Sequence, residues 1–147
     1  MRLVPVVLST LAVLPLPAAA QSPEGWAARE VVESYYADLS AGDYAAAYAL
    51  WGDGGAASGQ SFEEFRGGFA GTAATQVFTA PAGDPEGAAG SVYVTIPVRI
   101  EAERTDGTAQ LFGGSYTLRR SDVDGGETEW RLFDARIRRR DPVSPDR

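Results

Sequence analysis

Few side chains of this chain could carry out acid–base chemistry. The sequence contains no histidine and no cysteine, which removes the usual general base, the thiolate nucleophile and any disulfide. Carboxylates remain, and two of them converging in a pocket of low dielectric could transfer protons. Asp38, Asp53 and Asp134 are the candidates, but no characteristic spacing relates them, so we expect solvated carboxylates. Because metal-ligand spacings are also missing, the sequence predicts no catalytic residue, no metal site and no cofactor.

Arginine side chains could instead bind an anion. Arg66 falls on a predicted helix, and Arg99 falls on the polar face of a predicted strand, where Glu101 or Glu103 can pair with it. A basic cluster over residues 136–140 alternates with apolar residues before a proline-containing tail. We interpret this cluster as the solvated end of a strand, and a patch for an anionic partner is the alternative.

The aromatic residues indicate a binding chemistry. Aromatic walls with a few hydroxyl groups are typical of small-ligand pockets, and they equally fill closed cores. The sequence leaves both outcomes open. The candidate pocket residues are Tyr35, Tyr48, Trp51, Phe69, Tyr116 and Trp130.

Helical patterns dominate the first half of the chain. Helices are predicted over residues 22–40, 43–51 and 61–69. Ser22 and Asp43 can cap the first two at their N-termini, and Gly42 can end the first. Ser61 begins a capping box for the third. The glycine-rich segment 52–59 between the second and third helices is either a lid or a long connection.

Strand patterns dominate the second half. Strands are predicted over residues 75–79, 92–103 and 129–138, and the segment 81–90 is predicted as a loop. Strict alternation from Val92 to Ala102 indicates one buried and one polar face. Adjacent apolar residues at Leu132 and Phe133 suggest a local irregularity in the last strand.

The pairing of the long hairpin can also be predicted. Asp106-Gly107 is typical of a two-residue turn, which would place Ala102 opposite Leu111. That register would bury Arg119, so we expect a β-bulge at Gly113-Gly114 that turns Tyr116 and Leu118 inward. Such a bulge would bend the sheet.

The order of elements, with the motifs Tyr-Tyr-x-x-Leu, Ala-Gly-Asp-Tyr and Ala-Tyr-x-Leu-Trp, resembles the nuclear transport factor 2-like superfamily. This superfamily includes ketosteroid isomerase and scytalone dehydratase, and the resemblance covers about residues 26–137. It implies an α+β domain over residues 21–140, with three N-terminal helices packed on a bent antiparallel sheet of about four strands. The implied shape is a cone.

The resemblance implies little for catalysis. In ketosteroid isomerase a first-helix tyrosine lies seven residues before the glycine of the Gly-Asp turn, and Tyr35 has that spacing to Gly42. The family's aspartate base would fall in the segment 52–59, which lacks the acid-then-proline pattern, and its carboxylic acid would fall near Leu118 or Arg119. Tyr35 is therefore expected to be a core aromatic whose hydroxyl reaches the mouth of the cone.

The N-terminal segment predicts export. Arg2, the apolar run 3–16 and the small residues 18–20 are typical of a secretory signal peptide, so residues 1–20 are expected to be removed. An uncleaved anchor is the alternative. We expect a periplasmic or secreted protein with no stable membrane insertion after cleavage, and a disordered tail over residues 141–147. The net charge of −7 argues against nucleic acid as a partner.

Three functions follow as hypotheses. The first is an exported, non-catalytic domain that binds a small apolar or aromatic ligand in the cone. The second is a protein-interaction or homodimerisation module that uses the outer sheet face, with Tyr93, Thr95, Arg99 and Phe112. The third is an isomerase- or dehydratase-type enzyme in which Tyr35 donates a hydrogen bond.

Overall fold

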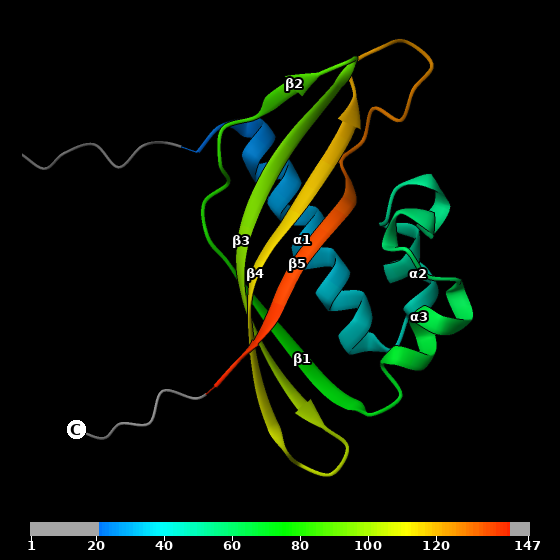
Figure 1. Ribbon diagram of the computed structural model, residues 1–147, viewed down its shortest axis with the longest axis vertical. Coiled ribbons are helices and arrows are strands. Elements are labelled where there is room, and N and C mark those ends of the chain that lie inside the picture. Colours follow the sequence, from blue (N-terminus) through cyan, green and yellow to red (C-terminus); the bar gives the residue numbers. More distant parts are fainter. Residues whose placement is uncertain (1–20, 142–147) are drawn as a thin grey trace, which may run out of the picture.

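The computed structural model describes residues 21–141 and has the predicted α+β architecture (Figure 1). The predicted signal peptide and residues 142–147 of the predicted tail lie outside the described residues. The helical elements come first: α1 (Pro23–Ala41), α2 (Tyr44–Ala49), the 3₁₀ helix η1 (Asp53–Ser58) and α3 (Phe62–Gly68). The strands follow: β1 (Thr72–Thr79), β2 (Glu86–Ala88), β3 (Ser91–Arg104), β4 (Ala109–Ser121) and β5 (Arg131–Arg140).

The helix termini are formed by the predicted caps. The hydroxyl of Ser22 accepts a hydrogen bond from the backbone N–H of Gly25 at 3.1 Å, and Asp43 accepts one from Ala46 at 3.0 Å. Gly42 ends α1 in the left-handed conformation, at φ 75°. The capping box at Ser61 is present with both of its hydrogen bonds.

The sheet is antiparallel, with the order β1-β3-β4-β5, and β2 extends the edge of β3 beyond β1. Four strands form the main path, as predicted, and the fifth is the three-residue β2, which forms within the predicted loop. Helix α1 crosses one face of the curved sheet (Figure 1). Its buried side chains, including Val32 and Leu39, pack in one core with the inward residues of β3, such as Val94 and Ile96. Burial of these apolar surfaces stabilises the two layers.

The hairpin between β3 and β4 differs from the predicted register by one residue. The backbone N–H of Arg104 donates to the carbonyl of Thr108 at 2.9 Å, so the loop has three residues and not two. Gly107 is left-handed at φ 84°, which is the geometry expected at the last position of such a loop. Ala102 consequently pairs with Gln110 instead of Leu111.

This shift removes the need for the predicted bulge at Gly113-Gly114. Pairing between β3 and β4 continues without interruption, and Tyr116 and Leu118 face inward opposite Ile96 and Val94. The prediction of the bulge was wrong, although the inward orientation that it was meant to explain is correct.

The irregularity of the sheet lies one strand further along. Thr117 pairs with Asp134 and Leu118 pairs with Leu132, which leaves Phe133 as an extra residue in β5. Leu132 is fully buried and Phe133 is exposed. The irregularity predicted at Leu132-Phe133 is confirmed, and its effect is to place Asp134 on the outer face, paired with Arg136 at 3.4 Å.

The glycine-rich segment between α2 and α3 is attached to the sheet. The backbone N–H of Gly52 donates to the carbonyl of Leu132, and the N–H of Leu132 donates to Leu50, each at 2.9 Å. Gly55 is left-handed at φ 104°, and a Cβ there would lie 2.1 Å from the Tyr48 ring. The segment is thus a fitted connection that covers part of the β5 edge.

Candidate functional site

A cavity of about 620 Å³ lies between the helices and the inner face of the sheet. Its walls are mainly apolar, and they come from α1, α3, β1, β3, β4 and β5 and from the segments that follow α2 and α3. The apolar and aromatic lining residues are Tyr35, Tyr36, Trp51, Phe65, Phe69, Ile100, Ala102, Phe112, Tyr116, Ala135 and Ile137. A cavity of this size and character is within the range of small-ligand sites in proteins.

Three tyrosines and one tryptophan form the polar part of the wall. The hydroxyl oxygens of Tyr36 and Tyr116 lie 2.8 Å apart and share a hydrogen bond. The Tyr35 hydroxyl also lies at this wall, beside the Trp51 side chain. The indole N–H of Trp51 is buried and lacks a partner in the described part of the chain. The Trp51 N–H is therefore a buried donor without a partner, and the adjacent Tyr35 hydroxyl is a second donor at the cavity wall.

Edge-to-face packing fixes the orientation of these rings. The Tyr35 ring centroid lies 5.1 Å from that of Tyr36, 6.2 Å from that of Trp51 and 6.0 Å from that of Tyr116, all in T-shaped arrangements. Phe65 closes the group at 6.3 Å from Tyr35. Because each ring contacts several others, the Tyr35 and Trp51 donors are held in place before any ligand arrives.

Burial keeps the three phenols neutral. It raises the pKa of Tyr35 well above the ordinary tyrosine value, and the nearby Tyr116 adds to this while the Trp51 N–H acts in the opposite direction. The pKa of Tyr36 is also raised by burial, against a smaller lowering by its hydrogen bond to Tyr116. The pKa of Tyr116 is raised for the same reason. These groups act as hydrogen-bond donors, not as phenolate bases.

The rim of the cavity is more polar than its interior. It includes Ser58, Gln60, Thr72, Arg104 and Gln110. No aspartate or glutamate is among the described lining residues, and no cluster of three potential metal ligands occurs in residues 21–141. The described site thus offers donors and apolar contacts, without a carboxylate that could abstract a proton.

Four of the six predicted pocket residues line this cavity: Tyr35, Trp51, Phe69 and Tyr116. Tyr48 does not, because it packs against Phe62 and its hydroxyl donates to the Gln60 carbonyl at 2.7 Å. Trp130 does not either, because it is buried elsewhere in the core beneath the Arg120 guanidinium.

Three aromatic contributors to the wall were missed from sequence. Phe112 was predicted on the outer face, but it pairs with Ile100 on the inner face because the hairpin register shifts by one. Tyr36 and Phe65 were visible as aromatic residues on helices. Helical spacing favours Tyr35 over its neighbour Tyr36 as the inward-facing residue. Both side chains are nevertheless buried, because a broad face of α1 is covered.

The candidate carboxylates do not converge. Asp38, Asp53 and Asp134 are all outside the cavity lining, and Asp134 lies on the outer face of the sheet. Arg66 pairs with Glu63 at 3.2 Å on α3. Arg99 pairs with Glu101, as predicted.

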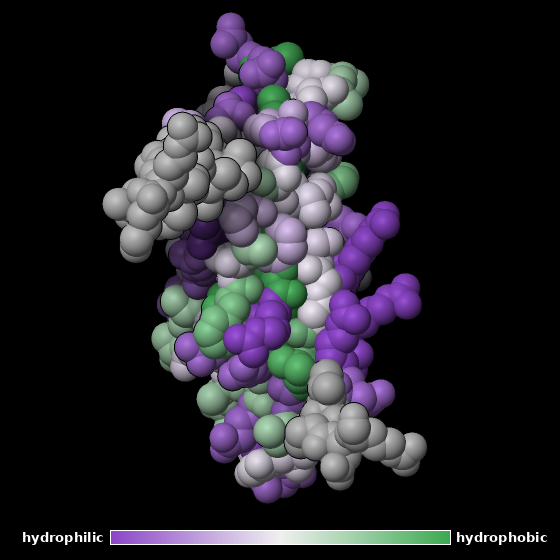
Figure 2. Space-filling model, turned by 90° about the vertical axis from the view of Figure 1, so that its left-hand side faces the viewer, coloured by the Kyte–Doolittle hydropathy of each residue, from purple (hydrophilic) through white to green (hydrophobic). Residues whose placement is uncertain are grey.

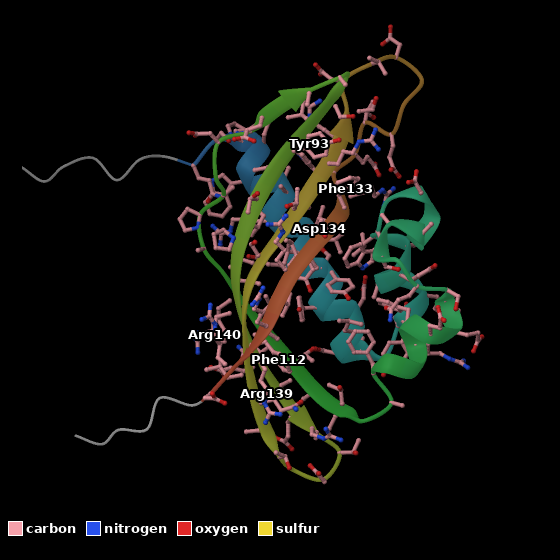
Figure 3. The ribbon with its side chains drawn as sticks, in the orientation of Figure 1. Tyr93, Phe112, Phe133, Asp134, Arg139 and Arg140 are labelled. Carbon is pink, nitrogen blue, oxygen red and sulfur yellow. The ribbon has the colours of Figure 1, made fainter. Side chains whose placement is uncertain are left out.

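The outer sheet face carries aromatic and basic side chains. Tyr93 and Phe133 contact each other edge to face at 5.4 Å, and the Arg99 guanidinium lies 4.1 Å from the centroid of the exposed Phe78 ring. Figure 3 shows Tyr93 and Phe133 together on the upper sheet, with Phe112 well away from them. Figure 2 shows hydrophilic side chains projecting along one margin of the molecule beside hydrophobic surface.

One solved structure matches this architecture. It is the crystal structure of a proposed aromatic ring hydroxylase from Novosphingobium aromaticivorans, at 15% identity and a TM-score of 0.57. The match covers 82% of this chain and 96% of that chain. This likeness shows that the two chains share a fold of N-terminal helices packed on a curved antiparallel sheet. No protein-family profile and no curated protein sequence matches the chain.

Proposed function

We propose that the cone is a binding site for a small, largely apolar molecule carrying one hydrogen-bond acceptor, such as the carbonyl oxygen of an aromatic ketone. The observation that carries this proposal is the buried indole N–H of Trp51, which has no partner among the described residues and lies beside the Tyr35 hydroxyl at the wall of an aromatic cavity. An unpartnered buried donor costs about 1–3 kcal/mol. A ligand oxygen that accepts from these groups would recover part of that cost.

The chemistry of the wall supports a neutral acceptor. The phenols of Tyr35 and Tyr116 have raised pKa values, so they donate hydrogen bonds across the neutral pH range. Aromatic and aliphatic side chains supply most of the remaining contact area. Such a wall suits an aromatic body of one or two rings with its oxygen directed at the donors.

The same wall favours binding over catalysis. Isomerisation or dehydration of a carbonyl compound requires a base near the reacting carbon. The described lining holds neither a carboxylate nor an imidazole, and the chain contains no histidine. We therefore propose a non-catalytic role, and we retain export to the periplasm or the outside as part of the proposal on the basis of residues 1–20. In residues 21–141, no helix is long and apolar enough to cross a membrane.

Calorimetric titration of two matched probes tests the proposal. An acetylnaphthalene carries the acceptor, and the corresponding ethylnaphthalene has a similar shape without it. We expect the ketone to bind more tightly, and Tyr35→Phe to weaken the ketone about fivefold while leaving the hydrocarbon unchanged, because only the ketone loses a hydrogen bond. Tyr93→Phe, on the outer face, is the control. Equal affinities of both probes for wild type and Tyr35→Phe would refute the proposed role of the donors.

The outer face supports a second candidate function, self-association or binding of a partner protein. Phe78 and Phe133 are 38% and 43% exposed, and an arginine lies over each ring, Arg99 over Phe78 and Arg119 over Phe133. Of the residues predicted for this role, Tyr93, Thr95 and Arg99 lie on this face and Phe112 does not. Sedimentation of wild type and Phe133→Ser distinguishes the outcomes: a homodimer that dissociates in the variant supports this function, and a monomeric wild type argues against a homodimer.

A further inference from the structure

The open end of the cavity carries positive charge on its inner face. Arg104 is the one charged residue among the described lining residues, and it continues the inward series of β3 after Ile100 and Ala102. Its Nη2 atom lies 3.7 Å from the position a Cβ would occupy on Gly71. The guanidinium thus lies along the backbone at the rim.

A second arginine lies on the same face. Arg139 pairs with Phe112 across β4 and β5, so its side chain leaves the sheet on the side of the cavity. Figure 3 shows Arg139 close to Phe112 at the lower end of the sheet. Arg104 on β3 and Arg139 on β5 therefore lie on the two strands next to β4, whose residues Phe112 and Gln110 line the cavity.

Neither arginine is well neutralised. Arg139 forms no ion pair with a described residue, and Arg104 reaches Asp106 only at 4.0 Å. Asp106 is already engaged by the backbone N–H of Thr108 at 2.9 Å. Glu101 and Glu103 belong to the outward series of β3, so their charges are directed away from the rim. In a chain with a net charge of −7, these two arginines place positive charge on the inner face of the sheet beside the cavity.

We propose that the ligand of the cone is an amphipathic carboxylate: an aromatic or apolar body with an acceptor oxygen at one end and an anionic group at the other. The body enters the cavity, the oxygen meets Tyr35 and Trp51, and the carboxylate stays at the rim beside Arg104, on the face that also carries Arg139. Guanidinium groups suit this role because they bind carboxylates through paired N–H donors. This inference rests on the proposed function and names its ligand class.

Solvent limits how strongly the arginines can favour a carboxylate ligand over a neutral one. The Arg104 side chain is 51% exposed, and an ion pair at such a site is weakened by water and by salt. We expect a carboxylate to bind about fivefold more tightly than its neutral amide. The preference should shrink as salt is added.

The test compares para-acetylphenylpropanoate with para-acetylphenylpropanamide by calorimetry, since the two differ only in the charged group. We expect Arg104→Gln and Arg139→Gln each to weaken the propanoate and to leave the amide unchanged. Arg138→Gln is the matched control, because Arg138 neighbours Arg139 but pairs with Gly113 on the outer face. Its effect on both probes should be negligible.

The outcomes separate this inference from the proposed function. A preference for the propanoate that is lost in Arg104→Gln supports the inference. Equal binding of both probes, unaffected by either inner-face substitution, overturns the inference and leaves the cone as a site for neutral ligands. Failure of both probes to bind, together with failure of the acetylnaphthalene, overturns the proposed function itself. Fluorescence-monitored unfolding of each variant verifies that the fold is retained.

Discussion

The Tyr36 hydroxyl on α1 lies 2.8 Å from the Tyr116 hydroxyl at the centre of β4. This hydrogen bond joins the first helix to the middle of the sheet across the wall of the cavity. Both side chains are almost entirely buried, so each hydroxyl depends on the other for its partner. The bond also holds Tyr116 against Tyr35, and it thereby positions the donor proposed to meet the ligand.

Removal of either hydroxyl should destabilise the fold, because the other becomes a buried group without a partner. We expect Tyr36→Phe and Tyr116→Phe each to lower the free energy of unfolding by about 1–2 kcal/mol. The double variant should lose less than the sum, since neither hydroxyl is then left unpaired. Urea denaturation of the four proteins measures the coupling, and strict additivity would show that the hydrogen bond contributes nothing.

Stability should fall at alkaline pH because of the buried phenols. Below the ordinary tyrosine pKa of about 10, folded and unfolded states both keep these protons. Above it the unfolded chain releases them while the folded chain, with raised pKa values at Tyr35, Tyr36 and Tyr116, does not. Each buried tyrosine then contributes a loss of up to about 1.4 kcal/mol per pH unit.

Urea denaturation at a series of pH values measures this slope. We expect Tyr35→Phe to make the slope shallower by the contribution of one tyrosine. An unfolding free energy that stays constant as the pH rises above about 10 would contradict the burial of the phenols.

Gly114 should tolerate no side chain. Its φ is 155°, and a Cβ there would lie 1.8 Å from the carbonyl oxygen of Arg136 on the neighbouring strand. We expect Gly114→Ala to cost about 3 kcal/mol or more, because strand β5 would have to move. Gly67→Ala is the control, since Gly67 is helical with no atom within 4 Å of its Cβ position, and alanine there should be neutral or stabilising. Thermal unfolding compares the two, and equal melting temperatures would refute the close approach.

Filling the cavity should abolish binding without unfolding the protein. Ala135 lines the cavity from β5, and Arg136 beside it projects outward with its side chain 83% exposed. We expect Ala135→Phe to lower the affinity for an acetylnaphthalene at least tenfold because the ring occupies the space of the ligand. Arg136→Phe adds the same ring on the opposite face and should bind as wild type does. Undiminished binding by Ala135→Phe would place the ligand elsewhere.

The elements of this fold were predictable where local signals agree. Ser22, Asp43 and Ser61 cap helices through their own side chains, and the alternation of β3 identifies its buried face without reference to other strands. Gly42 ends α1 because few other residues adopt its left-handed conformation. Each of these features depends on residues close together in the chain.

The pocket was less predictable because strand pairing decides it. A loop of three residues instead of two at Asp106-Gly107 shifts β4 by one position, which turns the side chains between the loop and Gly113 to the face opposite to the predicted one. Phe112 therefore lies in the cavity and not on the outer face. Tyr48 has the helical spacing of a pocket residue, but a short connection through Gly55 packs against its ring.

A crystal structure of the protein soaked with an acetylnaphthalene tests the central claim most directly. The account predicts a single molecule in the cavity between α1, α3 and the sheet, with its carbonyl oxygen within hydrogen-bond distance of the Tyr35 hydroxyl and the Trp51 indole nitrogen. A ketone bound only on the outer face beside Phe133, or a ketone in the cavity with its oxygen directed away from both donors, would contradict the account.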